Sequence, residues 1–286
     1  MAAPALALLA ALAFALGSTL QQRGALETPA PEGDPRFLIQ ILRRPAWLAG
    51  ASLQAAGWIL QAAALDRGSL VVVQSLCTLS IVIALPLGAL LTNQRVGRRA
   101  ATGAVCTVIG IVVFLAVGQP QNTSSRPAAV QILVWGAVAG AAMVALAVLA
   151  GRRRGALASA LFATGAGIGY GVQGAATKVF VEQLGGGLVT LLVLPATWVL
   201  LVSALAGFGL QQSALKTGWL GPAVAASNAA TLASSVLLGV VLFDESIGSA
   251  PGSLPVAIAA LALAVVGVAL LALPEGSARR RVSASR

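Results

Sequence analysis

Polar, uncharged side chains at helical spacing form the main chemical pattern in this sequence. Four apolar stretches carry such side chains three, four or seven residues apart, which places them on one face of a helix. A polar face of this kind either hydrogen-bonds a neighbouring helix or lines a cavity for a small polar molecule. The four faces comprise Gln54, Trp58 and Gln61; Gln74 and Thr78; Tyr170, Gln173 and Thr177; and Asn228, Thr231 and Ser235.

Residues that catalyse reactions or bind metals are scarce. The chain has no histidine, which is the commonest metal ligand and general base near neutral pH. Covalent catalysis needs a nucleophile beside such a base. The two cysteines, Cys77 and Cys106, both lie in apolar stretches, so no disulfide framework is indicated. We therefore expect no enzyme activity, no cofactor and no metal site.

Four carboxylates near the ends of apolar stretches leave an ionic alternative open. They are Asp66, Glu182, Asp244 and Glu245. Mg²⁺ prefers oxygen ligands and keeps much of its water, so these side chains could attract a divalent cation. We favour the simpler interpretation, in which they are solvated loop charges.

The elements that position these residues are membrane-spanning helices. Of the 286 residues, 58% are hydrophobic and 9% are charged, against about 25% charged in a soluble domain. A helix needs roughly 20 apolar residues to cross a bilayer. The sequence predicts an all-α membrane protein with nine spans, at about 4–22, 46–65, 69–91, 100–118, 129–150, 156–180, 188–210, 219–243 and 254–273.

The distribution of basic residues predicts how the chain crosses the membrane. With nine spans, 15 of the 18 Lys and Arg residues fall on one side, and only Arg67, Arg126 and Lys178 fall on the other. Because basic loops stay cytoplasmic, we expect the amino terminus outside and the carboxyl terminus inside a bacterial inner membrane. The net charge of +10 therefore indicates topology rather than nucleic-acid binding, and the tail 276–286 either fixes topology or contacts anionic lipids.

The sequence repeats itself at an offset of 150 residues. Residues 57–70 match 207–220 without a gap, with seven identities in 14 positions, and the same offset pairs Pro45 with Pro195 and Gln61 with Gln211. We predict a first repeat at 1–118, a connector span at 119–154, a second repeat at 155–275 and the basic tail. Equivalent spans of the two repeats, such as the first and the sixth, are five crossings apart, so the second repeat is inverted, a plan that recurs in secondary transporters.

Several short motifs resemble the drug/metabolite transporter superfamily, in its EamA-like and NIPA-like branches of actinobacterial type. They are Ala64-Leu65 with Gly68 and Pro86 in the first half, and Gln211–Leu215, Gly221-Pro222 and Leu242–Glu245 in the second. The resemblance implies a multi-pass transporter of metabolites or drugs that works by alternating access. EamA-type members usually have ten spans, whereas the nine predicted here are closer to the NIPA plan, whose association with magnesium gives the alternative function.

The repeat relates the polar faces to one another, because it pairs Thr78 with Asn228. We therefore predict one central cavity, whose candidate substrate-binding residues are Gln54, Trp58, Gln61, Gln74, Thr78, Tyr170, Gln173, Asn228 and Thr231. The glycines at 165, 167, 169, 171 and 174 indicate close helix packing rather than a locally broken helix. Gly136 and Gly140 indicate a further helix contact, within the chain or between the protomers of a homodimer.

Overall fold

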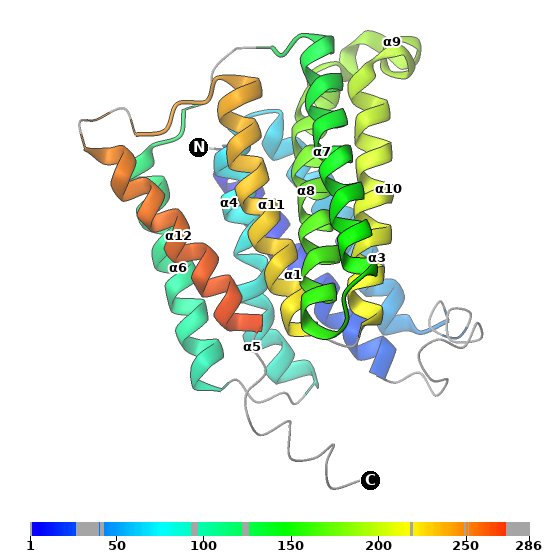
Figure 1. The fold of residues 1–286 in the computed structure, drawn as a ribbon, viewed down its shortest axis with the longest axis vertical. Helices are drawn as coiled ribbons and strands as arrows, with labels where there is room; N and C mark the ends of the chain where they lie inside the picture. The colour runs from blue at the N-terminus through cyan, green and yellow to red at the C-terminus, as the bar shows by residue number, and fades with distance from the viewer. Residues whose placement is uncertain are drawn as a thin grey trace, which may run out of the picture. The chain divides into compact units, whose positions relative to one another are not determined.

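A computed structural model describes residues 2–26, 40, 43–92, 97–121, 126–217, 220–248, 250 and 252–272, which are helical apart from short connections (Figure 1). The predicted tail lies outside these residues. Within the described ranges no strand forms, and one isolated bridge joins Gln121 to Ser246. The helices are α1 (Ala2–Leu26), α3 (Pro45–Leu65), α4 (Leu70–Thr78), α5 (Ser80–Thr92), α6 (Arg98–Gly118), α7 (Ala129–Gly151), α8 (Gly155–Glu182), the 3₁₀ turn η1 (Leu184–Gly186), α9 (Gly187–Val193), α10 (Pro195–Lys216), α11 (Leu220–Phe243) and α12 (Ser253–Ala272).

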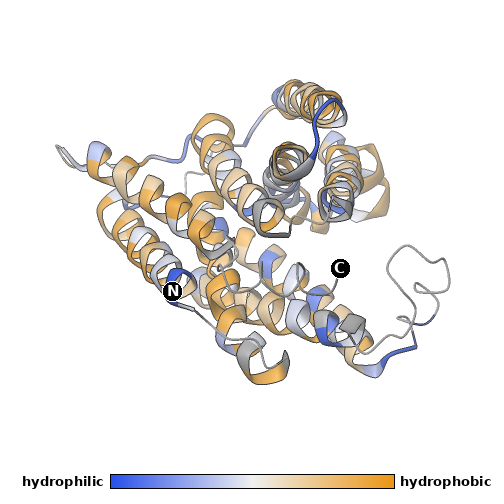
Figure 2. Ribbon diagram, turned by 60° about the horizontal axis from the view of Figure 1, so that its bottom comes forward, coloured by the Kyte–Doolittle hydropathy of each residue, from blue (hydrophilic) through white to orange (hydrophobic). Residues whose placement is uncertain are grey.

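The helices have the length and composition of membrane spans. Among the described residues, eight helical segments can cross a bilayer, and a ninth is obtained if the bent segment 184–214 is one span. Figure 2 shows apolar residues along most of each helix, and large apolar side chains such as Ile59 and Leu205 are at least 70% exposed. Such surfaces fit hydrocarbon rather than water. The chain is a multi-pass helical membrane protein, and every predicted span has a helical counterpart.

The predicted span 188–210 has the wrong bounds. The chain bends by 72° between α9 and α10, and α10 continues to Lys216. Proline has no backbone N–H and keeps the preceding residue out of the helical region, and Leu194 before Pro195 is accordingly extended. The hydroxyl of Thr197 and the indole N–H of Trp198 donate to the carbonyls of Leu191 and Leu192, so carbonyls freed by the bend are satisfied.

The predicted span 69–91 is also interrupted. Leu79 separates α4 from α5, and its N–H bonds to the carbonyl of Leu76 in a tighter turn. The interruption does not fall at Pro86, which lies inside α5. The residues on either side together remain long and apolar enough to form one span, Leu70–Gly88.

Packing divides the chain into two units. The first, unit 1, comprises residues 1–68 and 75–96; the second, unit 2, comprises residues 69–74 and 97–286. In unit 1, α1 packs against α3 and α5. Glycines allow the close approach of α1 and α3: a Cβ at Gly17 would lie 2.9 Å from the carbonyl oxygen of Gly50, and one at Gly57 would lie 2.6 Å from the ring of Phe14.

In unit 2, α8 is the central helix and packs against α7, α10 and α11. Glycine faces on two sides of α8 make this possible. Gly167 and Gly171 lie against the backbone and serine side chains of α11, whereas Gly169 lies against Met143 of α7 and Gly207 of α10. The predicted packing role of this glycine series is thus confirmed for these three positions. The long helices α6 and α12 lie side by side (Figure 1), in contact at Gly110 and Gly267.

Candidate functional site

The predicted cavity residues are divided between the two units. Gln54, Trp58, Gln61 and Thr78 belong to unit 1. The side chain of Gln54 lies against Gly17 of α1, and its Oε1 is buried without a hydrogen-bond partner. Trp58 makes an edge-to-face contact with Phe14 at 6.1 Å between ring centroids. Thr78 is buried and Gln61 is half-buried.

In unit 2, α8 carries two of the predicted residues. The ring of Tyr170 contacts Gly207 of α10. Gln173 is buried, and its Oε1 has no hydrogen-bond partner. An unpartnered buried amide oxygen is costly in an apolar surrounding, so Gln173 is the predicted residue of this unit best prepared to bind a polar group. Gln74 of α4 is also buried. Its side chain lies against Gly174 of α8, the residue after Gln173.

The polar residues of α11 are bonded within their own helix. The Asn228 amide donates to the carbonyl of Val224 at 2.8 Å, and the Thr231 hydroxyl donates to that of Ser227 at 2.8 Å. Both side chains are half-buried. The amide oxygen of Asn228 can still accept a hydrogen bond from a ligand. One N–H donor of Asn228 and the O–H donor of Thr231 are already engaged within the helix. Ser235 is fully buried, and its hydroxyl has no partner.

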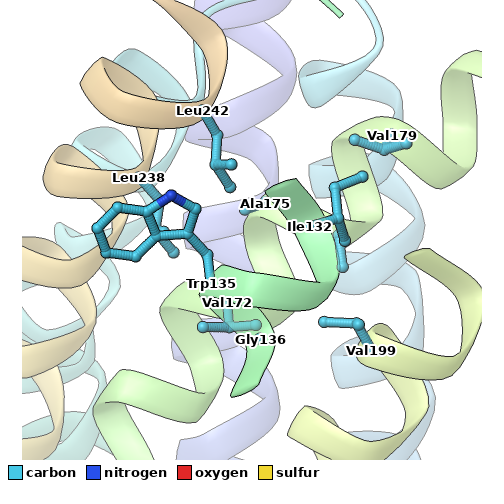
Figure 3. A pocket seen from close by; sticks show the side chains of 10 residues that line it. Ile132, Trp135, Gly136, Val172, Ala175, Val179, Val199, Leu238 and Leu242 are labelled. Carbon is cyan, nitrogen blue, oxygen red and sulfur yellow. The ribbon is translucent and has the colours of Figure 1, made fainter. Parts of the chain in front are cut away.

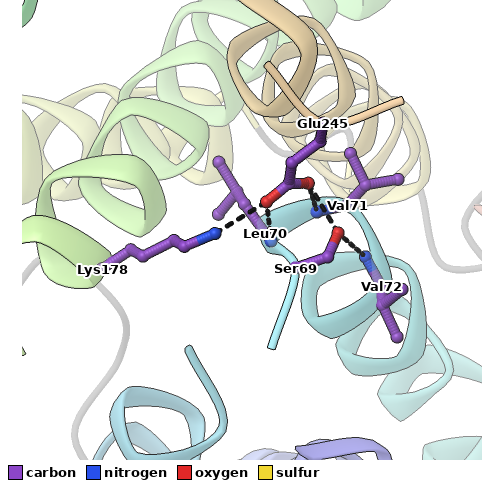
Figure 4. A network of polar contacts seen from close by, with 6 residues as sticks. All are labelled: Ser69, Leu70, Val71, Val72, Lys178 and Glu245. Carbon is purple, nitrogen blue, oxygen red and sulfur yellow. Dashed lines mark hydrogen bonds and ion pairs between the residues drawn. The ribbon is translucent and has the colours of Figure 1, made fainter. Parts of the chain in front are cut away.

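A buried ion pair is the strongest polar feature of unit 2 (Figure 4). Lys178 Nζ lies 2.8 Å from Glu245 Oε1, and the two side chains are 2% and 0% exposed. The same carboxylate accepts the Ser69 hydroxyl at 2.6 Å and the backbone N–H groups of Leu70 at 2.6 Å and Val71 at 2.9 Å. Four donors therefore surround one buried carboxylate.

This carboxylate caps the amino end of α4. The first backbone N–H groups of a helix have no partner within it, and a negative charge there is favoured by the helix dipole. Glu245 fills this role for Leu70 and Val71, and the Ser69 oxygen accepts the N–H of Val72 at 3.3 Å. Lys178 also lies 4.4 Å from the centre of the Phe243 ring. Its charge is thus matched by a carboxylate and an aromatic face.

The segment that supplies Glu245 is held in place at several points. We call residues Asp244–Gly248, which follow α11, the strap. Gln121 N–H donates to the Ser246 carbonyl at 3.3 Å, and Gly248 N–H donates to the Gly118 carbonyl at the end of α6 at 2.7 Å. Asp244 and Gly248 both have positive φ, 50° and 72°. The strap therefore joins the ends of α6, α8 and α11 and the start of α4.

The expectation that Glu245 is a solvated loop charge is wrong, whereas Lys178 lies in α8, as the predicted span 156–180 implies. Both residues are almost fully buried, because the end of α8 and the segment after α11 pack against the start of α4. The signal was present in the sequence: Lys178 is the one charged residue inside the predicted span 156–180. A lone lysine in an apolar helix requires an acidic partner, and alternating crossings bring Glu245 to the same end.

The other acidic residues near helix ends are exposed or lie near basic ones. Asp66 lies 3.9 Å from its neighbour Arg67, and Glu182 lies 3.8 Å from Arg126. Across the described part of the chain, no three His, Cys, Asp or Glu side chains gather where they could hold a metal ion.

Two hollows among the described residues of unit 2 are apolar. Figure 3 shows a small pocket where α7, α8, α10 and α11 meet, with Trp135 beside Leu238 and Leu242. A larger groove of about 810 Å³ lies along α7, α8 and α10, with Ser203 and Ser213 as its only hydroxyl groups. We predicted a helix contact at Gly136 and Gly140. Gly136 does lie against Val199 of α10, whereas a Cβ at Gly140 would meet no neighbouring atom. These surfaces suit hydrocarbon chains rather than a polar ligand.

Comparison with known proteins gives one clear relative. No known family profile matches the chain, and no solved structure matches it. Over 246 residues the chain is 30% identical to an uncharacterised protein of Corynebacterium glutamicum. The matched region covers 84% of this chain and 83% of that protein, so it includes most of the helices described above. The chain belongs to the same family as this corynebacterial protein.

Proposed function

We propose that the protein is a secondary transporter of small molecules, built from two inverted repeats and working by alternating access, as its resemblance to the drug/metabolite transporter superfamily implies. The observation that carries this proposal is the agreement of helix boundaries at the repeat offset. Adding 150 to the bounds of α3 (45–65) gives 195–215, and α10 spans 195–216. Adding 150 to the combined range of α4 and α5 (70–92) gives 220–242, and α11 spans 220–243.

Local packing also agrees between the two halves. Both α3 and α10 begin at a proline, Pro45 and Pro195, where a missing N–H has no consequence for the helix. Gly57 of α3 receives the ring of Phe14 from α1, and its repeat partner Gly207 of α10 receives the ring of Tyr170 from α8. In each half, the first helix packs against the second and against part of the third.

The ends of unit 2 support the proposed orientation. The strap lies at the carboxyl ends of α6, α8 and α11, so the opposite end carries their first residues. That opposite end holds the exposed arginines at 98, 99 and 152–154. Under the positive-inside rule this is the cytoplasmic end, which places the strap outside, in a bacterial inner membrane.

The polar residues indicate the class of cargo. Buried amide and hydroxyl groups, with Gln173 Oε1 unpartnered, fit a small molecule that carries hydrogen-bond donors. A divalent cation receives no support from the described carboxylates, since Glu245 is already held by Lys178 and by the start of α4. We therefore favour a polar metabolite or drug over magnesium.

A counterflow experiment tests this function. The purified protein is screened by thermal shift against metabolites, drugs and divalent ions, and each compound that stabilises it is assayed for exchange in proteoliposomes. We expect exchange of at least one compound, slowed about 3- to 10-fold by Gln173→Leu, the effect of losing one hydrogen bond. The matched control is Thr102→Val, an exposed threonine whose hydroxyl bonds only within α6. Compounds that bind but never exchange would contradict the proposal.

A further inference from the structure

Helix α4 has residues in both packing units. Its residues up to Gln74 belong to unit 2 together with Ser69, whereas Ser75–Thr78 belong to unit 1. The chain thus leaves unit 1 after Gly68, enters unit 2 for six residues and returns. Any relative movement of the two units must act on this helix.

Several contacts hold the start of α4 in unit 2. The Glu245 carboxylate accepts the Ser69 hydroxyl and the N–H groups of Leu70 and Val71. The side chain of Val71 is fully buried in a cluster with Phe114, Ala257 and Ala260. Gln74 lies against Gly174 of α8. Among these contacts, the carboxylate comes from a non-helical segment, whereas Phe114, Ala257, Ala260 and Gly174 lie in helices.

The strap is better suited to release than α4 is to bend. Residues 70–78 contain neither glycine nor proline, and the helix is continuous across Gln74 and Ser75. The strap instead ends at Gly248, whose φ is 72°, and Gly252 with φ 78° lies shortly after it. A non-helical segment that ends at a glycine absorbs backbone changes more readily than a helix interior does.

We propose that the strap is an extracellular latch: Glu245 locks the start of α4 onto unit 2, and its release lets that start move with the rest of the helix in unit 1. The inference rests on the proposed transport function, because alternating access supplies the relative movement. Lys178 remains behind on α8 and rebinds Glu245 when the latch closes. The structure described here has the latch closed.

A buried cysteine reports the latch directly. Val71→Cys is placed in a background in which Cys77 and Cys106 are replaced by alanine, and its alkylation by a maleimide is timed in the purified full chain. Single changes of the pair leave an unmatched buried charge, so the test variant is Lys178→Met with Glu245→Gln. The matched control is Glu182→Gln, which removes the carboxylate of the more exposed pair with Arg126.

We expect alkylation of the cysteine to accelerate about tenfold or more in the double variant, because hydrogen bonds from the start of α4 to a charged group are lost. The control variant reacts at the parent rate. Circular dichroism and cooperative thermal unfolding establish that each variant is folded. If the folded double variant reacts at the parent rate, the latch proposal is overturned. The movement is then assigned to a hinge at Leu79, with α4 staying fixed on unit 2.

A reversible lock gives a second test without removing any charge. The backbones of Gln121 and Ser246 pair in an antiparallel bridge, so cysteines at these two positions can join the strap to the end of α6. Oxidation should reduce exchange of a compound found in the counterflow screen about tenfold or more, and a reductant should restore it. Unchanged exchange in the oxidised protein overturns the latch. If no compound exchanges at all, the proposed transport function is contradicted. The alkylation rate of the cysteine at position 71 still shows whether the latch exists.

Discussion

Replacing Glu245 by glutamine should be among the most destabilising single changes in the described chain. Lys178 is 2% exposed and Glu245 is 0% exposed, so the change removes the carboxylate 2.8 Å from a buried ammonium group. Breaking a buried pair from one side typically costs about 3–5 kcal/mol. The reciprocal change, Lys178→Met, leaves the carboxylate with the Ser69 hydroxyl and two backbone N–H groups. Because these donors still compensate the negative charge, we expect a smaller cost of about 2–3 kcal/mol.

The double variant separates charge pairing from packing. When Lys178→Met and Glu245→Gln are combined, neither member of the pair carries a charge, and the new amide oxygen can still accept one of the N–H groups of α4. We expect the double variant to lose only about 1–2 kcal/mol, since neutral replacements of a buried pair are often tolerated. The sum of the single effects would then exceed the double by about 3 kcal/mol or more, a coupling energy at the upper end for residues in direct contact.

The measurement is unfolding of the purified protein in detergent, followed by circular dichroism against denaturant for the parent, both single variants and the double variant. Glu182→Gln serves as the control and should change stability by less than about 1 kcal/mol, because its pair with Arg126 is more exposed and longer. Additive single effects would refute the reasoning, since they would mean that Lys178 and Glu245 do not stabilise one another.

Three further predictions follow from the fold. In a background without native cysteines, Leu184→Cys should react with an impermeant thiol reagent in intact cells and Arg153→Cys should not; the reverse pattern would contradict the proposed orientation. Gly167→Leu should destabilise by about 1–3 kcal/mol or more in thermal unfolding, because a side chain there meets the backbone of α11, whereas Gly140→Ala, which meets no atom, should be nearly neutral. Asn228→Ala should slow exchange with little loss of stability, because its present bond is local to α11; normal exchange would assign it to packing.

The sequence was sufficient to predict the membrane-spanning helices, because their apolar composition identifies them. Long apolar stretches predicted the membrane-spanning helices, because the hydrocarbon thickness fixes their length. Interruptions inside a span were harder to predict. The bend before Pro195 follows from a local rule and was predictable, whereas the interruption at Leu79 has neither proline nor glycine beside it.

The candidate site shows the same division between local and long-range information. The helical faces of Gln173 and Asn228 follow from spacing alone. The partner of Lys178 lies 67 residues further along the chain, and the N–H groups that complete the site lie 175 and 174 residues before Glu245. No periodicity joins such positions. Only an argument from the isolated lysine and the alternating direction of the spans would have found the pair.

The order in which these residues are synthesised has a consequence for assembly in the membrane. Lys178 is made 67 residues before Glu245, an interval of about 3 to 13 s at typical elongation rates. The first turn of α4 is made 175 residues before the carboxylate that caps it, about 9 to 35 s earlier. Until the ribosome has passed Glu245, Lys178 and the first turn of α4 therefore lack the carboxylate that both contact in the folded protein. A chain that stops before the strap cannot complete unit 2, however many of its helices have already entered the bilayer.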